Sequence, residues 1–202
     1  MALYLAHAFD PETPQDETLE TLEAFADGIR AGKIGAVGAS NFGAEQLAET
    51  LELSQFEGLP RYDWVQNGFS LLERGDTETV FPLLRERALG YTPFRPLAGG
   101  WLTGKYRRNE PPPAGSRMTL RPEPDAGYAS DRVFTALEEL EREAAGRGVS
   151  MAAPALAWAF SLPELTGVVV GPGCAEHLAP AFEELEIDLS RTDRNHLMEV
   201  FA

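Results

Sequence analysis

The chain has 202 residues, which suits one domain (1–202), because single cores grow to roughly 250 to 300 residues before chains divide. Asp and Glu outnumber Lys and Arg by 32 to 17, so a surface of net charge -15 repels nucleic acid and anionic lipid. We expect a cytoplasmic protein without membrane association, because there is neither an apolar run of ~20 residues nor a signal peptide, and Cys174 is the single cysteine.

Strand-like runs alternate with helix-period segments along the chain, which is the pattern of a parallel sheet built from βα units. The runs are short and mostly apolar on both faces, as strands covered by helices are. The predicted strands are Leu3–Ala6, Ile34–Ala39, Tyr62–Val65, Leu89–Phe94 and Thr166–Val170.

The segments between these strands carry helix signals. Thr13 can cap a first helix that has Pro14 in its first turn and ends at Gly32, and Pro82 begins or kinks another helix. The apolar stripes at helical spacing are Leu19, Leu22, Ala26 and Ile29; Ala44, Leu47, Ala48 and Leu51; Phe134, Leu137, Leu140 and Ala144; and Leu178, Phe182 and Leu185. The proline-rich stretch 99–130 breaks the pattern and is predicted to be a long functional loop.

Polar and aromatic residues follow the predicted strands. In a (β/α) barrel, the carboxyl ends of the strands face one mouth, where the active site is assembled. His7, Ser40-Asn41, Gln66-Asn67 and Phe94 stand at these ends and could together hold a planar carboxamide ring. Each also has a structural interpretation: His7 as a core histidine, Ser40-Asn41 as a helix cap and Gln66-Asn67 as a turn. No Cys/His cluster has metal-ligand spacing, so we expect no metal.

Four stretches resemble one known family and occur in that family's order. They are residues 7–14, 31–42, 65–67 and 92–106. In these stretches the chain is similar to the aldo-keto reductases, above all to their bacterial and potassium-channel-β-like branch. The resemblance implies a (β/α)₈ TIM barrel and an NADPH-dependent reduction of an aldehyde or ketone, that is, of a small-molecule carbonyl substrate.

The resemblance also implies roles for individual residues. His7 would orient the substrate carbonyl, and Phe94 would stack on the nicotinamide ring. Ser40, Asn41 and Gln66 would hold the nicotinamide carboxamide. The pyrophosphate would lie along Leu97, Gly99, Leu102, Thr103, Gly104 and Lys105. Gly173 stands where relatives often place an arginine for the 2′-phosphate of NADP, which keeps NAD open as the alternative, and Arg95 stands where serine is usual.

The family's catalytic aspartate, tyrosine and lysine have no counterpart here. They precede the histidine in relatives, while only six residues precede His7, and the two lysines, Lys33 and Lys105, lie outside any such arrangement. We therefore expect a partial barrel of about five βα units that lacks the first three strands, truncated and impaired or inactive as an isolated chain. The alternative is a non-catalytic, nicotinamide-nucleotide-binding or structural remnant or regulatory subunit. Open barrel edges would favour a homo-oligomer.

Overall fold

The computed structural model describes the backbone of residues 1–202 and every side chain except those of residues 24–27. Ala26, a member of the first predicted apolar stripe, therefore lies outside the described side chains. The chain forms two compact units that interleave along the sequence. The sheet unit comprises Met1–Gly68, Gly75–Phe94 and Glu164–Gly167; the helical unit comprises Phe69–Arg74, Arg95–Pro163 and Val168–Ala202.

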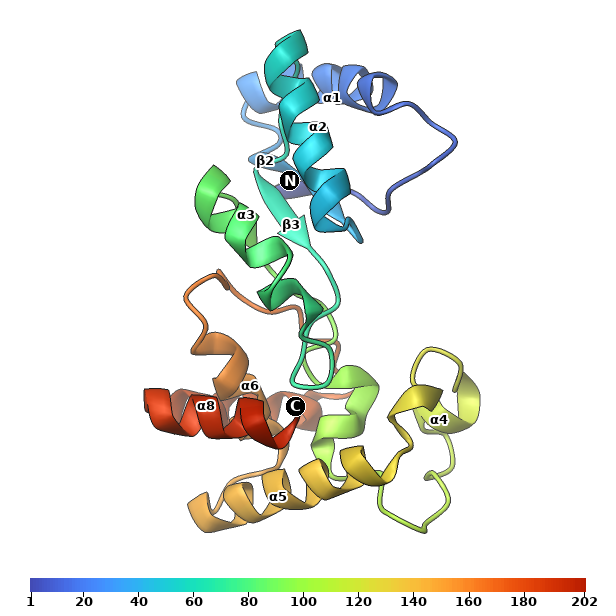
Figure 1. The fold of residues 1–202 in the computed structure, drawn as a ribbon, viewed down its shortest axis with the longest axis vertical. Coiled ribbons are helices and arrows are strands. Elements are labelled where there is room, and N and C mark those ends of the chain that lie inside the picture. The colour runs from blue at the N-terminus through green and yellow to red at the C-terminus, as the bar shows by residue number, and fades with distance from the viewer. The chain divides into compact units, whose positions relative to one another are not determined.

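The sheet unit is built around four parallel strands in the order β1-β2-β3-β4; β2 and β3 are labelled in Figure 1. Its elements in chain order are β1 (Leu3–Ala6), α1 (Gln15–Arg30), β2 (Ala36–Ser40), α2 (Ala44–Glu57), β3 (Trp64–Gln66), a 3₁₀ turn (Gly75–Thr77), α3 (Val80–Arg87) and β4 (Gly90–Tyr91). This alternation confirms the predicted parallel α/β arrangement, because parallel neighbours need a crossover and a helix supplies it.

The two faces of the sheet differ. Val37 and Val65 point to the face that is buried, and Phe81 of α3 packs edge-on against Tyr91 there, with ring centroids 5.3 Å apart. On the opposite face, the Trp64 side chain lies against the Cα atoms of Gly38 and Gly90. Trp64 itself is only half-buried. The sheet therefore has one helix-covered face and one partly open face.

The expected fifth strand, Thr166–Val170, does not form. Thr166 donates its N–H to the Tyr91 carbonyl at 2.8 Å, and its hydroxyl accepts the Tyr91 N–H at 3.4 Å. Thr166 borders β4, and Val169 makes no more than an isolated β-bridge; Val169 and Val170 are both exposed. An apolar β-branched run becomes a strand only where consecutive residues pair with a neighbouring backbone.

The helix ends of the sheet unit differ from the predicted caps. Thr13 donates its hydroxyl to Asp10 Oδ2 at 2.9 Å, so it closes the loop before α1 and does not cap that helix. Gly32 lies in the left-handed region just beyond α1, as predicted. The α2 helix begins after Gly43, whose N–H donates to Gln46 Oε1 at 2.9 Å. Ser40 and Asn41 are therefore not the cap residues of α2.

The helical unit contains the remaining helices. They are α4 (Arg117–Leu120), α5 (Asp131–Arg147), α6 (Ala152–Phe160), α7 (Ala179–Glu183) and α8 (Arg191–Val200), with 3₁₀ turns at Ala98–Thr103, Ala126–Tyr128, Ala175–Leu178 and Glu184–Glu186. Most of α6 is buried, and its Trp158 stacks on Phe69 at 5.5 Å between ring centroids. The predicted stripe on α5 is buried at Leu137, Leu140 and Ala144.

The last predicted stripe does not form. Phe182 is 66% exposed and Leu185 is 71% exposed, whereas Glu184 between them is buried. The α7 helix ends at Glu183 and a tighter 3₁₀ turn follows, so Leu185 no longer stands at α-helical spacing from Phe182. Of the helices in the described chain, none is long and apolar enough to cross a bilayer.

Candidate cofactor site

The carboxyl ends of the first three strands are joined by hydrogen bonds. Asn41 donates its side-chain Nδ2–H to the His7 carbonyl at 2.8 Å. Ser40 donates its hydroxyl to the Gln66 carbonyl at 2.7 Å, and the Asn41 backbone N–H donates to the same carbonyl at 3.2 Å. The structure therefore brings together the residues that the sequence places at the ends of β1, β2 and β3.

Asn41 turns the chain out of β2 in a left-handed conformation, with φ 58°. Among non-glycine residues, asparagine is one of the few that visits this region often, which explains the residue type. Its Nδ2 also lies 3.1 Å from the Ser40 hydroxyl oxygen, so the two side chains orient each other. Ser40 and Asn41 therefore form hydrogen bonds at the ends of the strands, and the predicted interpretation of these residues as a helix cap is wrong.

Two side chains at this edge keep their polar groups available. Within the described chain, neither the His7 imidazole nor the Gln66 amide makes a hydrogen bond, and His7 is exposed. An exposed imidazole does not fit the alternative of a core histidine. Both side chains can therefore accept or donate to a ligand at the strand ends.

Phe94 belongs to the same edge. It forms a parallel bridge with Gly68, and its N–H donates to the Asn67 carbonyl at 3.0 Å. The side chain is half-buried, so part of the ring surface is open to stack on a planar group.

In the helical unit, the predicted pyrophosphate residues form a turn with an unusual backbone. Ala98, Gly99, Gly100 and Gly104 all have positive φ. The Ala98 N–H donates to the Arg95 carbonyl and the Gly100 N–H donates to the Leu97 carbonyl, both at 2.8 Å, so internal hydrogen bonds hold this turn. The Thr103 hydroxyl donates to the Gly100 carbonyl at 2.7 Å and closes the turn.

Lys105 reaches over this turn. Its Nζ lies where a side chain at Gly100 would have to start, and the φ of 97° at Gly100 favours glycine there. The ammonium also lies 5.2 Å from the centroid of the Tyr106 ring. Leu97 is half-buried and Leu102 is buried, so the side chains of these two residues pack into the protein and anchor the turn.

A buried carboxylate, Asp125, anchors the long loop beside the same turn. It forms ion pairs with Arg95 and with Arg117, the latter at 3.0 Å between Nε and Oδ2. A Cβ atom at Gly99 would lie 2.5 Å from Asp125 Oδ2, so the turn and the carboxylate are in direct contact. Burial raises the pKa of the nearby Tyr128 hydroxyl, and Glu73 and Asp125 add to the effect against Arg95.

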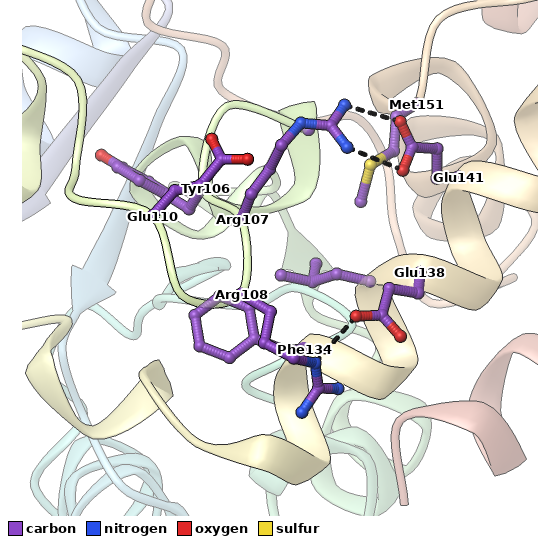
Figure 2. A pocket seen from close by; sticks show the side chains of 10 residues that line it. Tyr106, Arg107, Arg108, Glu110, Phe134, Glu138, Glu141 and Met151 are labelled. Atoms are coloured by element: carbon purple, nitrogen blue, oxygen red, sulfur yellow. Dashed lines mark hydrogen bonds and ion pairs between the residues drawn. The ribbon is translucent and has the colours of Figure 1, made fainter.

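A cavity of about 200 Å³ lies next to this region, between Gly104 and helix α5 (Figure 2). The charged side chains that line it form ion pairs: Arg107 pairs with Glu141, and Arg108 pairs with Glu138. Phe134, Leu137 and Met151 supply apolar lining. Of the predicted site residues, only Gly104 lines this cavity.

Asn67, which the sequence places with Gln66 at a strand end, is buried and bonds to Phe42 and Asp76. Two further contributors were not predicted as site residues. Asp125 and Arg117 lie in the proline-rich loop, where no periodic pattern marks a buried ion pair. Among the described residues, no group of three or more His, Cys, Asp or Glu side chains is placed to hold a metal ion.

Comparison with known proteins agrees with the resemblance found in the sequence. The model of the aldo/keto reductase family matches residues 1–201. The uncharacterized oxidoreductase YrpG of Bacillus subtilis is 33% identical, over 98% of this chain and 58% of its own length. An aldo-keto reductase of Pseudocercospora fijiensis is 30% identical, over 91% of this chain and 64% of its own.

A third relative carries a defined activity in its name. The L-glyceraldehyde 3-phosphate reductase of Escherichia coli is 31% identical, over 87% of this chain and 51% of its own length. The chain thus spans between about half and two thirds of the length of these curated relatives.

Proposed function

The chain belongs to the aldo/keto reductase family, and from this we propose that it binds NADPH and serves the reduction of an aldehyde or ketone. The observation that supports this most is the hydrogen-bonded edge at which His7, Ser40, Asn41 and Gln66 meet. A carboxamide needs both donors and acceptors in one plane, and this edge offers amide, hydroxyl and imidazole groups together.

In the sheet unit, the proposed roles follow from which atoms stay available. The Asn41 Nδ2 and the Ser40 hydroxyl proton are used internally, which leaves Asn41 Oδ1 and the whole Gln66 amide for the nicotinamide carboxamide. Phe94 offers its ring for stacking. His7 would donate a hydrogen bond from its imidazole to the substrate carbonyl oxygen and so orient it.

In the helical unit, the turn formed by Ala98–Thr103 with Gly104 and Lys105 fits a pyrophosphate. Its glycines leave the backbone of the turn uncovered by side chains, and Lys105 adds a positive charge for an anion. Arg95 and Arg117 add two more, shared with Asp125. In a chain of net charge -15, such a concentration of cations favours an anionic ligand.

When bound, the nicotinamide supplies the hydride, and the carbonyl oxygen then needs a proton. Tyr62 and Tyr91 are poor sources of that proton: burial raises the pKa of Tyr62 to about 12, and the Tyr91 hydroxyl donates to Asp76 at 2.6 Å. These observations favour a second candidate function, in which this chain binds the nucleotide and reduces carbonyls slowly or not at all.

The test is a fluorescence titration with NADPH and NADH, followed by turnover assays on a panel of aldehydes that includes glyceraldehyde 3-phosphate. We expect saturable NADPH binding, with NADH as the weaker ligand. Lys105→Ala should weaken binding about tenfold by removing one phosphate contact, whereas Lys33→Ala, the other lysine, should not. Absence of NADPH binding would reject the proposed function.

His7 separates the two candidate functions. If the chain turns over aldehydes, His7→Ala should abolish that turnover while leaving NADPH affinity close to wild type, and His177→Ala, an exposed histidine in the helical unit, should change neither. Binding without any turnover selects the non-catalytic role.

We also propose a cytoplasmic location and self-association. In the described sheet, β1 has no neighbour on its outer side, and Leu5 and Trp64 leave the open face partly apolar. Light scattering over a dilution series should show a dimer or larger species; a monomer at all concentrations would reject self-association.

A further inference from the structure

Phe42, the residue directly after Asn41, is fixed by hydrogen bonds with Asn67 and by packing against two aromatic rings. The Asn67 side chain bonds to both of its backbone polar groups: the Phe42 N–H donates to Asn67 Oδ1 at 3.2 Å, and Asn67 Nδ2 donates to the Phe42 carbonyl at 2.9 Å. The Phe42 ring packs edge-on against Phe9 and Tyr62, at 5.4 and 5.6 Å between centroids. The backbone after Asn41 is therefore fixed.

The Asn67 side chain is itself oriented by Asp76. Its Nδ2 also donates to Asp76 Oδ2 at 2.9 Å, and the Tyr91 hydroxyl donates to the same oxygen at 2.6 Å. Asn67 is 7% exposed, so losing these bonds would leave buried polar groups unpaired. A chain of hydrogen bonds thus runs from β4 through Asp76 and Asn67 to Phe42.

This network explains how Asn41 keeps its left-handed backbone. A non-glycine residue with positive φ persists only where its surroundings over-determine it. We propose that Asn67, braced by Asp76 and Tyr91, is a positioning residue that holds the Ser40-Asn41 turn in the geometry that receives the nicotinamide carboxamide. The proposal rests on the proposed function, because it assigns a role at that same site. Asn67 itself does not touch the ligand.

The test compares two ligands that share the adenine end and differ in the nicotinamide end. NADPH affinity is measured by fluorescence titration, and 2′,5′-ADP affinity is measured by competition. Asn67→Ala should weaken NADPH about tenfold and leave 2′,5′-ADP within about twofold of wild type. Ser54→Ala is the matched control, because it removes a buried hydroxyl that donates to the Leu59 carbonyl in the same unit. It should change neither affinity.

Tyr91→Phe is the milder variant and decides the question if Asn67→Ala does not fold. It removes the hydroxyl that orients Asp76, keeps the ring, and should weaken NADPH about threefold with 2′,5′-ADP unchanged. Equal losses for both ligands, or no loss for either, would overturn the positioning role. Absence of NADPH binding to the wild-type chain would instead overturn the proposed function and this inference with it.

Discussion

The sheet unit and the helical unit hold their candidate ligand groups by different forces. At the sheet edge, neutral hydroxyl and amide groups of Ser40 and Asn41 bond to backbone carbonyls that the parallel register has already placed. At the glycine turn, Arg95 and Arg117 are held through the buried charge of Asp125. We therefore expect steric substitutions to destabilise the sheet edge, and removal of charge or addition of salt to destabilise the glycine turn.

Gly38→Ala tests the steric side and should have the largest effect. An added Cβ would meet the Trp64 carbonyl oxygen and would lie 2.8 Å from Trp64 Cβ and 2.9 Å from a Leu5 methyl carbon. The backbone of β3 cannot retreat without breaking its pairing, so we expect a loss of roughly 3 kcal/mol in the free energy of unfolding. Urea denaturation gives the value.

The matched control for this change is Gly75→Ala, because nothing lies within 4 Å of a Cβ atom at Gly75 and its φ is not positive. It should leave stability nearly unchanged. Hydrogen exchange should show that Gly38→Ala loosens β1–β3 and leaves α5 and α6 protected. Equal loosening of α5 would contradict a local effect of the added Cβ atom.

Among the described side chains of the sheet unit, Tyr62 has a strongly raised pKa. Burial raises its pKa from 10.0 to about 12, so the unfolded chain releases this proton first as pH rises. The stability that depends on the protonated Tyr62 hydroxyl is fully present below pH 10 and is lost as pH rises through about 12. The total loss is roughly 2 to 3 kcal/mol in the free energy of unfolding. Urea unfolding of Tyr62→Phe between pH 8 and pH 11 should show a flatter loss than wild type; parallel curves would contradict the assignment.

Asp125→Asn tests the charge side. The carboxylate is fully buried, and its loss leaves Arg95, which is 20% exposed, without its counter-charge. Because both arginine side chains remain partly exposed to solvent, we expect the free energy of unfolding to fall by about 2 kcal/mol, which is less than for a fully buried pair. Thermal unfolding at low and high salt measures it. Glu141→Gln, which breaks the exposed pair with Arg107, should have little effect, and an equal effect would show that burial of the pair does not matter.

The sequence predicted the residues of the sheet edge and of the glycine turn better than the ion pairs beside that turn, for a physical reason. Strand periodicity and parallel pairing place His7, Ser40 and Gln66 at one edge, and four stretches in family order pointed to the same residues. Ion pairs such as Asp125 with Arg117 join loop residues that no period relates, so the sequence offers no signal for them. The missing strand at Thr166–Val170 shows a further limit: a strand also needs consecutive pairing with a neighbouring backbone, and Val169 makes only an isolated bridge.

Glu184→Gln gives the smallest expected effect and sharpens the comparison within the helical unit. Burial raises the pKa of Glu184 above its ordinary value of 4.5, so the unfolded chain loses this proton first as pH rises. The charged form therefore destabilises the fold at neutral pH, and the variant should be slightly more stable than wild type at pH 7 and unchanged near pH 4. Glu186→Gln, exposed two residues along, is the control and should change neither value. Destabilisation of Glu184→Gln at pH 7 would mean that this buried carboxylate, like Asp125, is stabilised by its surroundings.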